Sequence, residues 1–127
     1  MICCLSAYLD EIENPELNLY ELNDKLSWGY DIEHIHANAD GSMEVSEEQL
    51  GLQNSIGNLV LLEYDINRSI QNIPFEQKVN RSEGKLCYRD SKYASIAKIR
   101  KNQQWGITEM QHRLEDEYNR IVSFIWD

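Results

Sequence analysis

The residues with the clearest capacity for chemistry lie in one short stretch, residues 31–36, which reads DIEHIH and combines carboxylates with imidazoles. Asn58 stands at the start of a later apolar run, and Asn67 follows nine residues further on. A neutral imidazole, whose unperturbed pKa is about 6.5, is a suitable general base at neutral pH. One carboxylate and one amide carbonyl, completed by waters, are oxygen ligands of the kind that Mg²⁺ prefers. These residue types suit metal-assisted hydrolysis of a phosphodiester, in which the cation acts as a Lewis acid on the phosphate and the leaving oxygen.

The elements around these residues are expected to bring them together. Alternation over 28–36 predicts a strand, and the short apolar run 59–63 predicts a second strand. A short helix is expected from Asp65, which can cap it, and Pro74 would end it. Strand, loop, strand and helix make a compact hairpin with a helix laid across it. Such a unit can bring a strand carboxylate and a helix amide to one metal ion.

The geometry of a strand limits which of these side chains share a site. Adjacent residues of a regular strand point to opposite faces. Glu33 and His34 can therefore serve one site only if the strand ends, twists or bulges at that point. His34 and His36 are the pair that would naturally share a face.

Helices are expected on both sides of this hairpin. Residues 2–12 show apolar residues at helical spacing, and a weaker helical segment covers 16–26. One capping-box pattern at 46–49 opens a short helix, 75–104 combine helix with loop, and a second capping box at 108–111 opens the clearest helix. An apolar stripe is expected along that last helix, formed by Met110, Leu114, Tyr118, Ile121 and Ile125. The three tryptophans are expected in the core: Trp28, Trp105 and Trp126.

Length and composition bound the class of protein. A chain of 127 residues has the size of a single domain. No apolar run approaches the roughly 18 residues of a membrane span, and the start lacks the basic flank of a signal peptide, so a soluble cytoplasmic protein is expected. The three cysteines form no Cys-x-x-Cys pair, which gives no support to a zinc ribbon or a thioredoxin-like motif and fits reduced structural thiols.

The charge is unevenly distributed along the chain. The net charge of −10 argues against simple nucleic-acid binding, because phosphates attract cationic surfaces. Residues 1–63 carry 13 acids and one base, whereas 64–101 carry nine bases and four acids. A charge run is usually a solvated face, but this contrast suggests one face for phosphate and another for a partner. The candidate phosphate contacts, which could also be solvated charges, are Arg68, Lys78, Arg81 and Arg100.

The chain contains the motif Tyr-Asp-Ile-Glu-His-Ile, then the motif Gly-Asn-Leu-Val-Leu-Leu, and a second asparagine nine residues after the asparagine of that second motif. This pattern resembles the ββα-metal motif of HNH (His-Asn-His) endonucleases. The resemblance is closest to the C-terminal HNH domain of GmrSD-type modification-dependent restriction enzymes. It covers about 28–78, and a weaker likeness reaches residue 126 through Phe75-x-x-Lys78, Tyr93-x-x-Ile96, Trp105 and a helix with Ile107 and Arg113.

The resemblance implies a role for each motif position. It places Glu33 and Asn67 as metal ligands, His34 as general base and Asn58 as the residue that orients this base. Two further positions are candidates: Gln71 as a third ligand, and His36 as a metal or phosphate contact or an ordinary strand residue. The family often has proline where this chain has Ala37, which puts the local turn in question but not the chemistry.

The resemblance implies an α+β fold with a ββα-metal core, surrounding helices and a long C-terminal helix. The expected organisation is one domain over 1–127, with a helical extension over 1–27, the core over 28–73 and a helical part over 74–127. The implied function is a DNA endonuclease of restriction or phage defence that uses one Mg²⁺ or Mn²⁺, with DNA favoured over RNA and a protein partner or a missing N-terminal domain. Two alternatives stay open: a nuclease-like interaction module that scaffolds a defence complex, and an acidic DNA mimic or inhibitor, which the charge alone favours.

Overall fold

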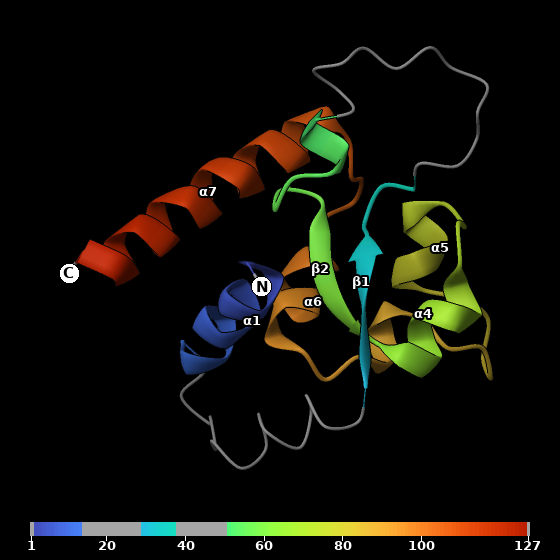
Figure 1. Ribbon diagram of the computed structural model, residues 1–127. Helices are drawn as coiled ribbons and strands as arrows, with labels where there is room; N and C mark the ends of the chain where they lie inside the picture. Colours follow the sequence, from blue (N-terminus) through green and yellow to red (C-terminus); the bar gives the residue numbers. More distant parts are fainter. Residues whose placement is uncertain (1, 14–28, 38–50, 127) are drawn as a thin grey trace.

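The computed structural model describes residues 2–13, 29–37 and 51–126 (Figure 1). The helix expected over 16–26, the capping box expected at 46–49 and the core position expected for Trp28 lie outside the described residues, whereas residues 51–53 are helical. In chain order the elements are α1 (Ile2–Ile12), β1 (Tyr30–His34), β2 (Leu59–Glu63), α4 (Tyr64–Ile70), α5 (Phe75–Val79), the 3-10 helix η1 (Tyr88–Asp90), α6 (Ala94–Ile99) and α7 (Ile107–Trp126).

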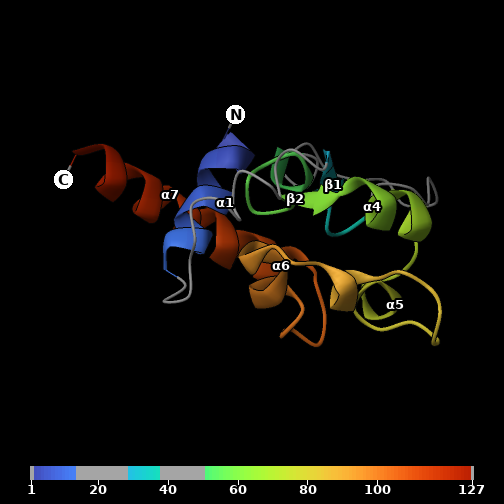
Figure 2. The ribbon, with the colours of Figure 1, turned by 90° about the horizontal axis from the view of Figure 1, so that it is seen from below.

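β1 and β2 pair as an antiparallel hairpin, with Tyr30 opposite Glu63 and His34 opposite Leu59. β2 has the predicted bounds, whereas β1 ends at His34, two residues before the predicted end. α4 follows β2 directly and packs against both strands, and α1 and α6 pack against β2. Figures 1 and 2 show that α1 and α4 flank the hairpin, while α5 and α6 form a layer across one of its faces. The α+β class is therefore as predicted.

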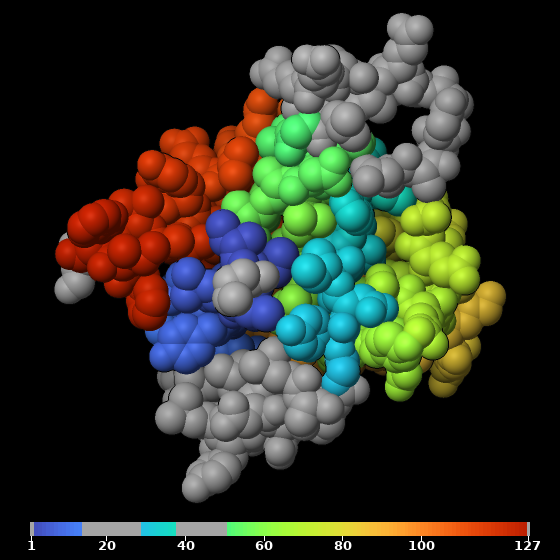
Figure 3. All heavy atoms as spheres, in the orientation of Figure 1, coloured from blue at the N-terminus to red at the C-terminus, as the bar shows by residue number. Residues whose placement is uncertain are grey.

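The core lies between the hairpin and the layer of α5, η1 and α6. Three successive β2 residues, Val60, Leu61 and Leu62, are all buried, and α1, α4 and α6 pack against this strand. β1 is half open, and Ile32 is one of its exposed residues. In the space-filling view the side chains of β1 reach the surface beside α4 (Figure 3).

The loop before β2 is held tightly against α7. A Cβ added to Gly57 would lie 2.2 Å from the Met110 carbonyl oxygen, so only glycine permits this close approach. The Arg113 guanidinium donates hydrogen bonds to the carbonyl oxygens of Ile56 and, at 2.8 Å, of Leu59. α7 thereby fixes the backbone on both sides of Asn58.

Two helix starts differ from the predictions. α4 begins at Tyr64, with Glu63 at the N-cap and no side-chain cap, so Asp65 lies inside the first turn instead of capping it. α7 begins at Ile107, and the Glu109 carboxylate accepts the backbone N–H of Gly106 at 2.8 Å. Glu109 is therefore the third residue of the helix. The predicted capping box gave this position to a residue two places further along the chain.

The apolar stripe of α7 is buried only in its first half. Met110 is 2% exposed, whereas Tyr118 is 65% and Trp126 is 80% exposed. The core position predicted for Trp126 is wrong, because the C-terminal end of α7 extends beyond the body of the domain (Figure 1). Trp105 is buried, as predicted. In the described part of the chain, no helix has the length and apolar character needed to cross a membrane.

Candidate active site

An open pocket lies where β1 ends beside α4. It is lined by Ile32, Glu33, His34, Asn67, Arg68, Gln71 and Asn72. The two candidate metal ligands, the candidate base and the weaker ligand candidate thus border one pocket. Neighbouring residues Glu33 and His34 both border it, at the end of β1.

Glu33 is only 5% exposed, and one of its two carboxylate oxygens is held from the interior. The Tyr88 hydroxyl donates to Glu33 Oε2 at 3.0 Å, and the Lys78 ammonium lies 3.2 Å from the same oxygen. Among the described residues, Oε1 has no hydrogen-bond partner. Burial raises the pKa of Glu33, although the charge of Lys78 and the hydrogen bonds from Lys78 and Tyr88 oppose that shift.

Lys78 does not face solvent. Its ammonium is fully buried and donates to the carbonyl oxygens of His34, at 2.8 Å, and Ile35, at 3.2 Å, besides its ion pair with Glu33. Three acceptors thus match its three N–H donors. Burial lowers the pKa of Lys78, and Glu33 opposes this shift. The interpretation of Lys78 as a phosphate contact does not agree with this arrangement, because every donor is directed into the protein.

Asn67 is oriented in a comparable way. Its side-chain Nδ2 donates to Asp31 Oδ2 at 2.9 Å, which leaves the amide oxygen without a partner among the described residues. Asp31 and Glu33 stand two residues apart on β1 and so share a face of the strand. No role is predicted for Asp31 from the sequence, although its spacing from Glu33 is the available signal.

The His34 ring is contacted by an asparagine that is not among the predicted site residues. His34 Nε2 lies 3.1 Å from the Oδ1 of Asn54, in the loop before β2. When Asn54 Oδ1 accepts this bond, Nε2 carries the ring proton and Nδ1 keeps the lone pair of a base. No sequence motif marks Asn54, because only the folded loop brings it to the ring.

Asn58 is fully buried and holds the backbone that follows the base. Its Oδ1 accepts the N–H of His36 at 2.8 Å, and its Nδ2 donates to the carbonyls of His36, at 3.1 Å, and Gln53, at 3.0 Å. Its own carbonyl accepts the N–H of Ile35 at 2.9 Å. Asn58 therefore acts on the position of His34 through the main chain, without contact to the ring.

His36 lies outside the pocket of Glu33 and Asn67. Its Nδ1 is 3.0 Å from the carbonyl oxygen of Trp105, and its ring borders a neighbouring pocket beside Phe75. His34 and His36 do not share a strand face, because His36 follows the end of β1. Asn72 borders both pockets and lies between them.

The three arginines proposed as phosphate contacts differ in whether the guanidinium group bonds to the main chain. Arg68 is exposed, borders the pocket and stacks 3.6 Å from the ring centroid of Tyr64, a cation–π contact. Arg81 donates to the carbonyls of Ser69 and Leu86, and Arg100 donates to those of Tyr88 and Arg89. Arg81 and Arg100 therefore brace the loop between α5 and α6.

The donor set of the pocket fits a hard divalent cation with waters. Within the described residues no group of three or more histidine, cysteine, aspartate or glutamate side chains could hold a metal ion. The pocket instead offers one carboxylate oxygen of Glu33 and one amide oxygen of Asn67. Mg²⁺ is commonly bound through one or two such groups, with waters and substrate phosphate completing its shell.

Comparison with known families decides the kind of domain. The chain matches the family described as GmrSD restriction endonucleases, C-terminal domain, over residues 2–116. It belongs to this family. The prediction of a GmrSD-type C-terminal domain is confirmed, and a GmrSD C-terminal domain is a domain of a restriction endonuclease. No curated protein and no solved structure matches the chain. The family match ends within α7, before the most exposed aromatic residues of that helix.

Proposed function

We propose that this GmrSD-type domain is a metal-dependent endonuclease of the HNH class, which hydrolyses DNA phosphodiester bonds in restriction or phage defence. One observation carries the proposal. Glu33, His34 and Asn67 border the same open pocket, and each is held at one atom by another residue, so that Oε1, Nδ1 and Oδ1 remain for chemistry. Arrangements of this kind place reacting groups before substrate arrives, which is where much of catalysis originates.

Glu33 Oε1 and Asn67 Oδ1 would hold one Mg²⁺ or Mn²⁺ ion, with Gln71 at the pocket rim as a further ligand. When bound, the ion supplies Lewis-acid stabilisation of the phosphate and of the leaving oxygen. His34 Nδ1 takes a proton from the attacking water as the new P–O bond forms and the bond to the leaving oxygen breaks. Asn54 keeps the ring in the orientation and tautomer that this step requires, and Asn58 fixes the backbone behind it.

The charge distribution indicates how substrate reaches this pocket. Arg68 is an exposed cation that borders the pocket, whereas the Lys78 ammonium and the Nη1 groups of Arg81 and Arg100 donate to main-chain carbonyl oxygens. With a net charge of −10, the domain on its own should bind duplex DNA weakly. We propose that a partner protein or a further domain supplies most of the grip on DNA.

The test is a plasmid-nicking assay with Mg²⁺ or Mn²⁺, with EDTA as the metal-free control. His34→Ala should reduce the nicking rate by about 10²–10⁴-fold, the usual effect of losing a positioned base. His112→Ala, at an exposed position on α7, should leave the rate unchanged. A folded His34→Ala variant that nicks at the wild-type rate would show that the base is assigned to the wrong residue.

The exposed C-terminal end of α7 favours one alternative, an interaction module that scaffolds a larger defence complex. Phe124, Ile125 and Trp126 are all exposed. On this alternative the folded domain would show little or no divalent-dependent nicking, with or without its partner. Nicking by the wild type that His34→Ala abolishes would exclude it.

A further inference from the structure

We infer that Lys78 and Tyr88 are positioning residues of this active site, holding Glu33 by one oxygen so that the other faces the pocket. Lys78 also fixes the end of the strand that carries His34. The inference rests on the proposed function, because it concerns how the proposed metal ligand and base are presented. It assigns a role to two buried residues that the proposed mechanism does not otherwise use.

The first observation is that both donors bind the same carboxylate oxygen. Tyr88 Oη lies 3.0 Å and Lys78 Nζ 3.2 Å from Glu33 Oε2. A carboxylate held on one oxygen from the interior cannot rotate freely, so its second oxygen has a defined direction. Glu33 itself borders the pocket, which makes that second oxygen the one available to a cation. Carboxylate ligands of metal ions are commonly fixed by such hydrogen bonds.

The second observation is that Lys78 bonds to the backbone at the point where β1 ends. The carbonyl oxygens of His34 and Ile35 both accept its N–H groups. These two residues follow Glu33 directly, so one ammonium connects the candidate ligand with the main chain of the candidate base. The main-chain carbonyl oxygen of Asn58 accepts the N–H of Ile35, and its side-chain Oδ1 accepts the N–H of His36. The end of β1 is thereby held by two buried side chains, and Glu33 and His34 are fixed relative to one another.

A buried ion pair can also be purely structural, and two features argue against that here. Lys78 and Tyr88 converge on a group at the edge of an open pocket rather than inside a closed core. They also leave one oxygen of Glu33 without a partner among the described residues, whereas a structural pair is most stable when every oxygen is bonded. The arrangement therefore suits presentation of Glu33 to a further ligand.

Tyr88→Phe tests the first observation with almost no change of volume. Mn²⁺ affinity, measured by calorimetry on the DNA-free domain, should weaken by about 10–100-fold, the usual effect of removing such a hydrogen bond. The kcat for nicking should fall, and KM for DNA should stay within about twofold, because Tyr88 is buried away from substrate. Tyr93→Phe, the same substitution at a buried tyrosine outside the pocket, is the matched control and should leave Mn²⁺ affinity unchanged.

Lys78→Met tests the second observation, since methionine keeps the apolar stem and removes the ammonium. Mn²⁺ affinity and kcat should both fall, while the salt dependence of DNA binding stays unchanged. A lysine that contacted phosphate would do the reverse, lowering the salt slope by about one and sparing Mn²⁺ affinity. That reverse result would overturn the inference. If Lys78→Met does not fold, Tyr88→Phe decides alone.

Measurements on the wild-type domain distinguish a failure of the positioning role from a failure of the proposed function. Wild type that binds Mn²⁺ and nicks DNA, with Tyr88→Phe and Lys78→Met retaining full Mn²⁺ affinity, would overturn the positioning role and leave the proposed function intact. Wild type that neither binds Mn²⁺ nor nicks DNA would overturn both. Thermal unfolding of each variant, compared with that of Tyr93→Phe, shows whether a loss of affinity exceeds what lower stability produces.

Discussion

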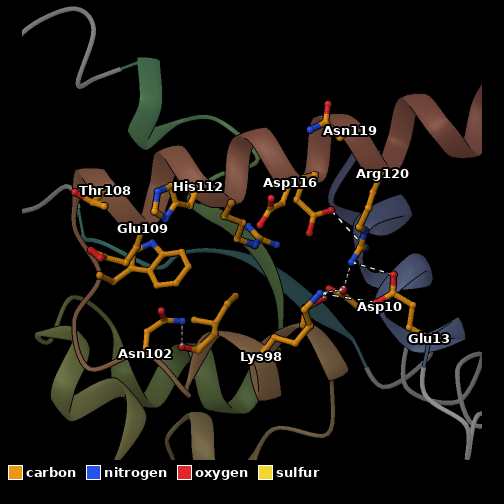
Figure 4. A pocket seen from close by; sticks show the side chains of 15 residues that line it. Asp10, Glu13, Lys98, Asn102, Thr108, Glu109, His112, Asp116, Asn119 and Arg120 are labelled. Carbon is orange, nitrogen blue, oxygen red and sulfur yellow. Dashed lines mark hydrogen bonds and ion pairs between the residues drawn. The ribbon is translucent and has the colours of Figure 1, made fainter.

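Asp10 on α1 and Glu33 on β1 are both buried carboxylates, 4% and 5% exposed, but their oxygens are occupied differently. Asp10 Oδ2 accepts the Ser95 hydroxyl, and its Oδ1 accepts both Lys98, at 2.9 Å, and Arg120, at 2.6 Å. Figure 4 shows Lys98 and Arg120 converging on Asp10 from opposite sides of a polar groove between α1, α6 and α7. Every oxygen of Asp10 therefore has a partner.

Glu33 has its bonds on one oxygen only, at the edge of the candidate active site. The pKa values follow this difference. Burial raises the pKa of Asp10, but the bonds from Ser95, Lys98 and Arg120 outweigh it, and the net shift is downward. For Glu33 burial prevails and the net shift is upward. A fully bonded buried carboxylate stabilises the fold, whereas a half-bonded one at a pocket is the better candidate for function.

The largest effect should come from exchanging the two carboxylates for amides. Glu33→Gln should reduce metal-dependent nicking by at least about 100-fold, since it removes a proposed metal ligand, a larger change than losing an outer-shell bond. Asp10→Asn should leave the rate per folded molecule nearly unchanged. The plasmid-nicking assay, normalised to folded protein by circular dichroism, measures both. Equal losses in the two variants would mean that the comparison does not separate function from structure.

The free energy of unfolding, in contrast to the nicking rate, should depend strongly on Asp10. Asp10→Ala leaves Lys98 and Arg120 without their shared partner and should lower the free energy of unfolding by about 3 kcal/mol, the lower end for a broken buried ion pair, because Lys98 is half exposed. Urea unfolding at pH 7 measures this change. A cost below about 0.5 kcal/mol, as at ordinary surface positions, would contradict the assigned role.

The pH dependence of stability should also show the contribution of the Asp10 carboxylate. Because the folded-state pKa of Asp10 is below its unfolded value, near 3.9, Asp10 stabilises the fold above that value and loses its contribution as pH falls through the folded pKa. Lys98, Arg120 and Ser95 are the groups that face it, with Glu13 beside the two cations. Urea midpoints between pH 3 and 7 should therefore fall less steeply towards acid in Asp10→Asn than in the wild type.

The smallest effect should come from the residue that orients the base. Asn54→Ala removes the bond to His34 Nε2 but touches neither the metal ligands nor the core. The kcat for nicking should fall by about tenfold, the lower end for an outer-shell contact, and Mn²⁺ affinity should not change. Calorimetry and nicking rates check the two halves of this expectation. A loss of Mn²⁺ affinity would show that Asn54 supports the whole pocket instead of the imidazole.

Local patterns were sufficient to predict two elements of the core with their bounds. The helix over 2–12 and the strand over 59–63 have the predicted bounds, because apolar spacing and turn residues are properties of neighbouring positions. The predictions were wrong where the outcome depends on residues that are distant in the sequence. The stripe on α7 has helical spacing along its whole length, but whether a stripe is buried depends on what packs against it. α1 bonds to the second half of α7 at Glu117 and Arg120, which are not part of the stripe.

The sequence by itself determined the chemistry on offer: a carboxylate, an imidazole and two asparagines at fixed spacings, and through them the family. Tertiary structure alone decided how those groups are held. Asn54, Lys78 and Tyr88 are 20, 44 and 55 residues away from the groups they contact, and their types give no sign of that role. Lys78 shows why: in the sequence it is one of nine bases in a cationic segment, and only folding desolvates it against Glu33 and the end of β1.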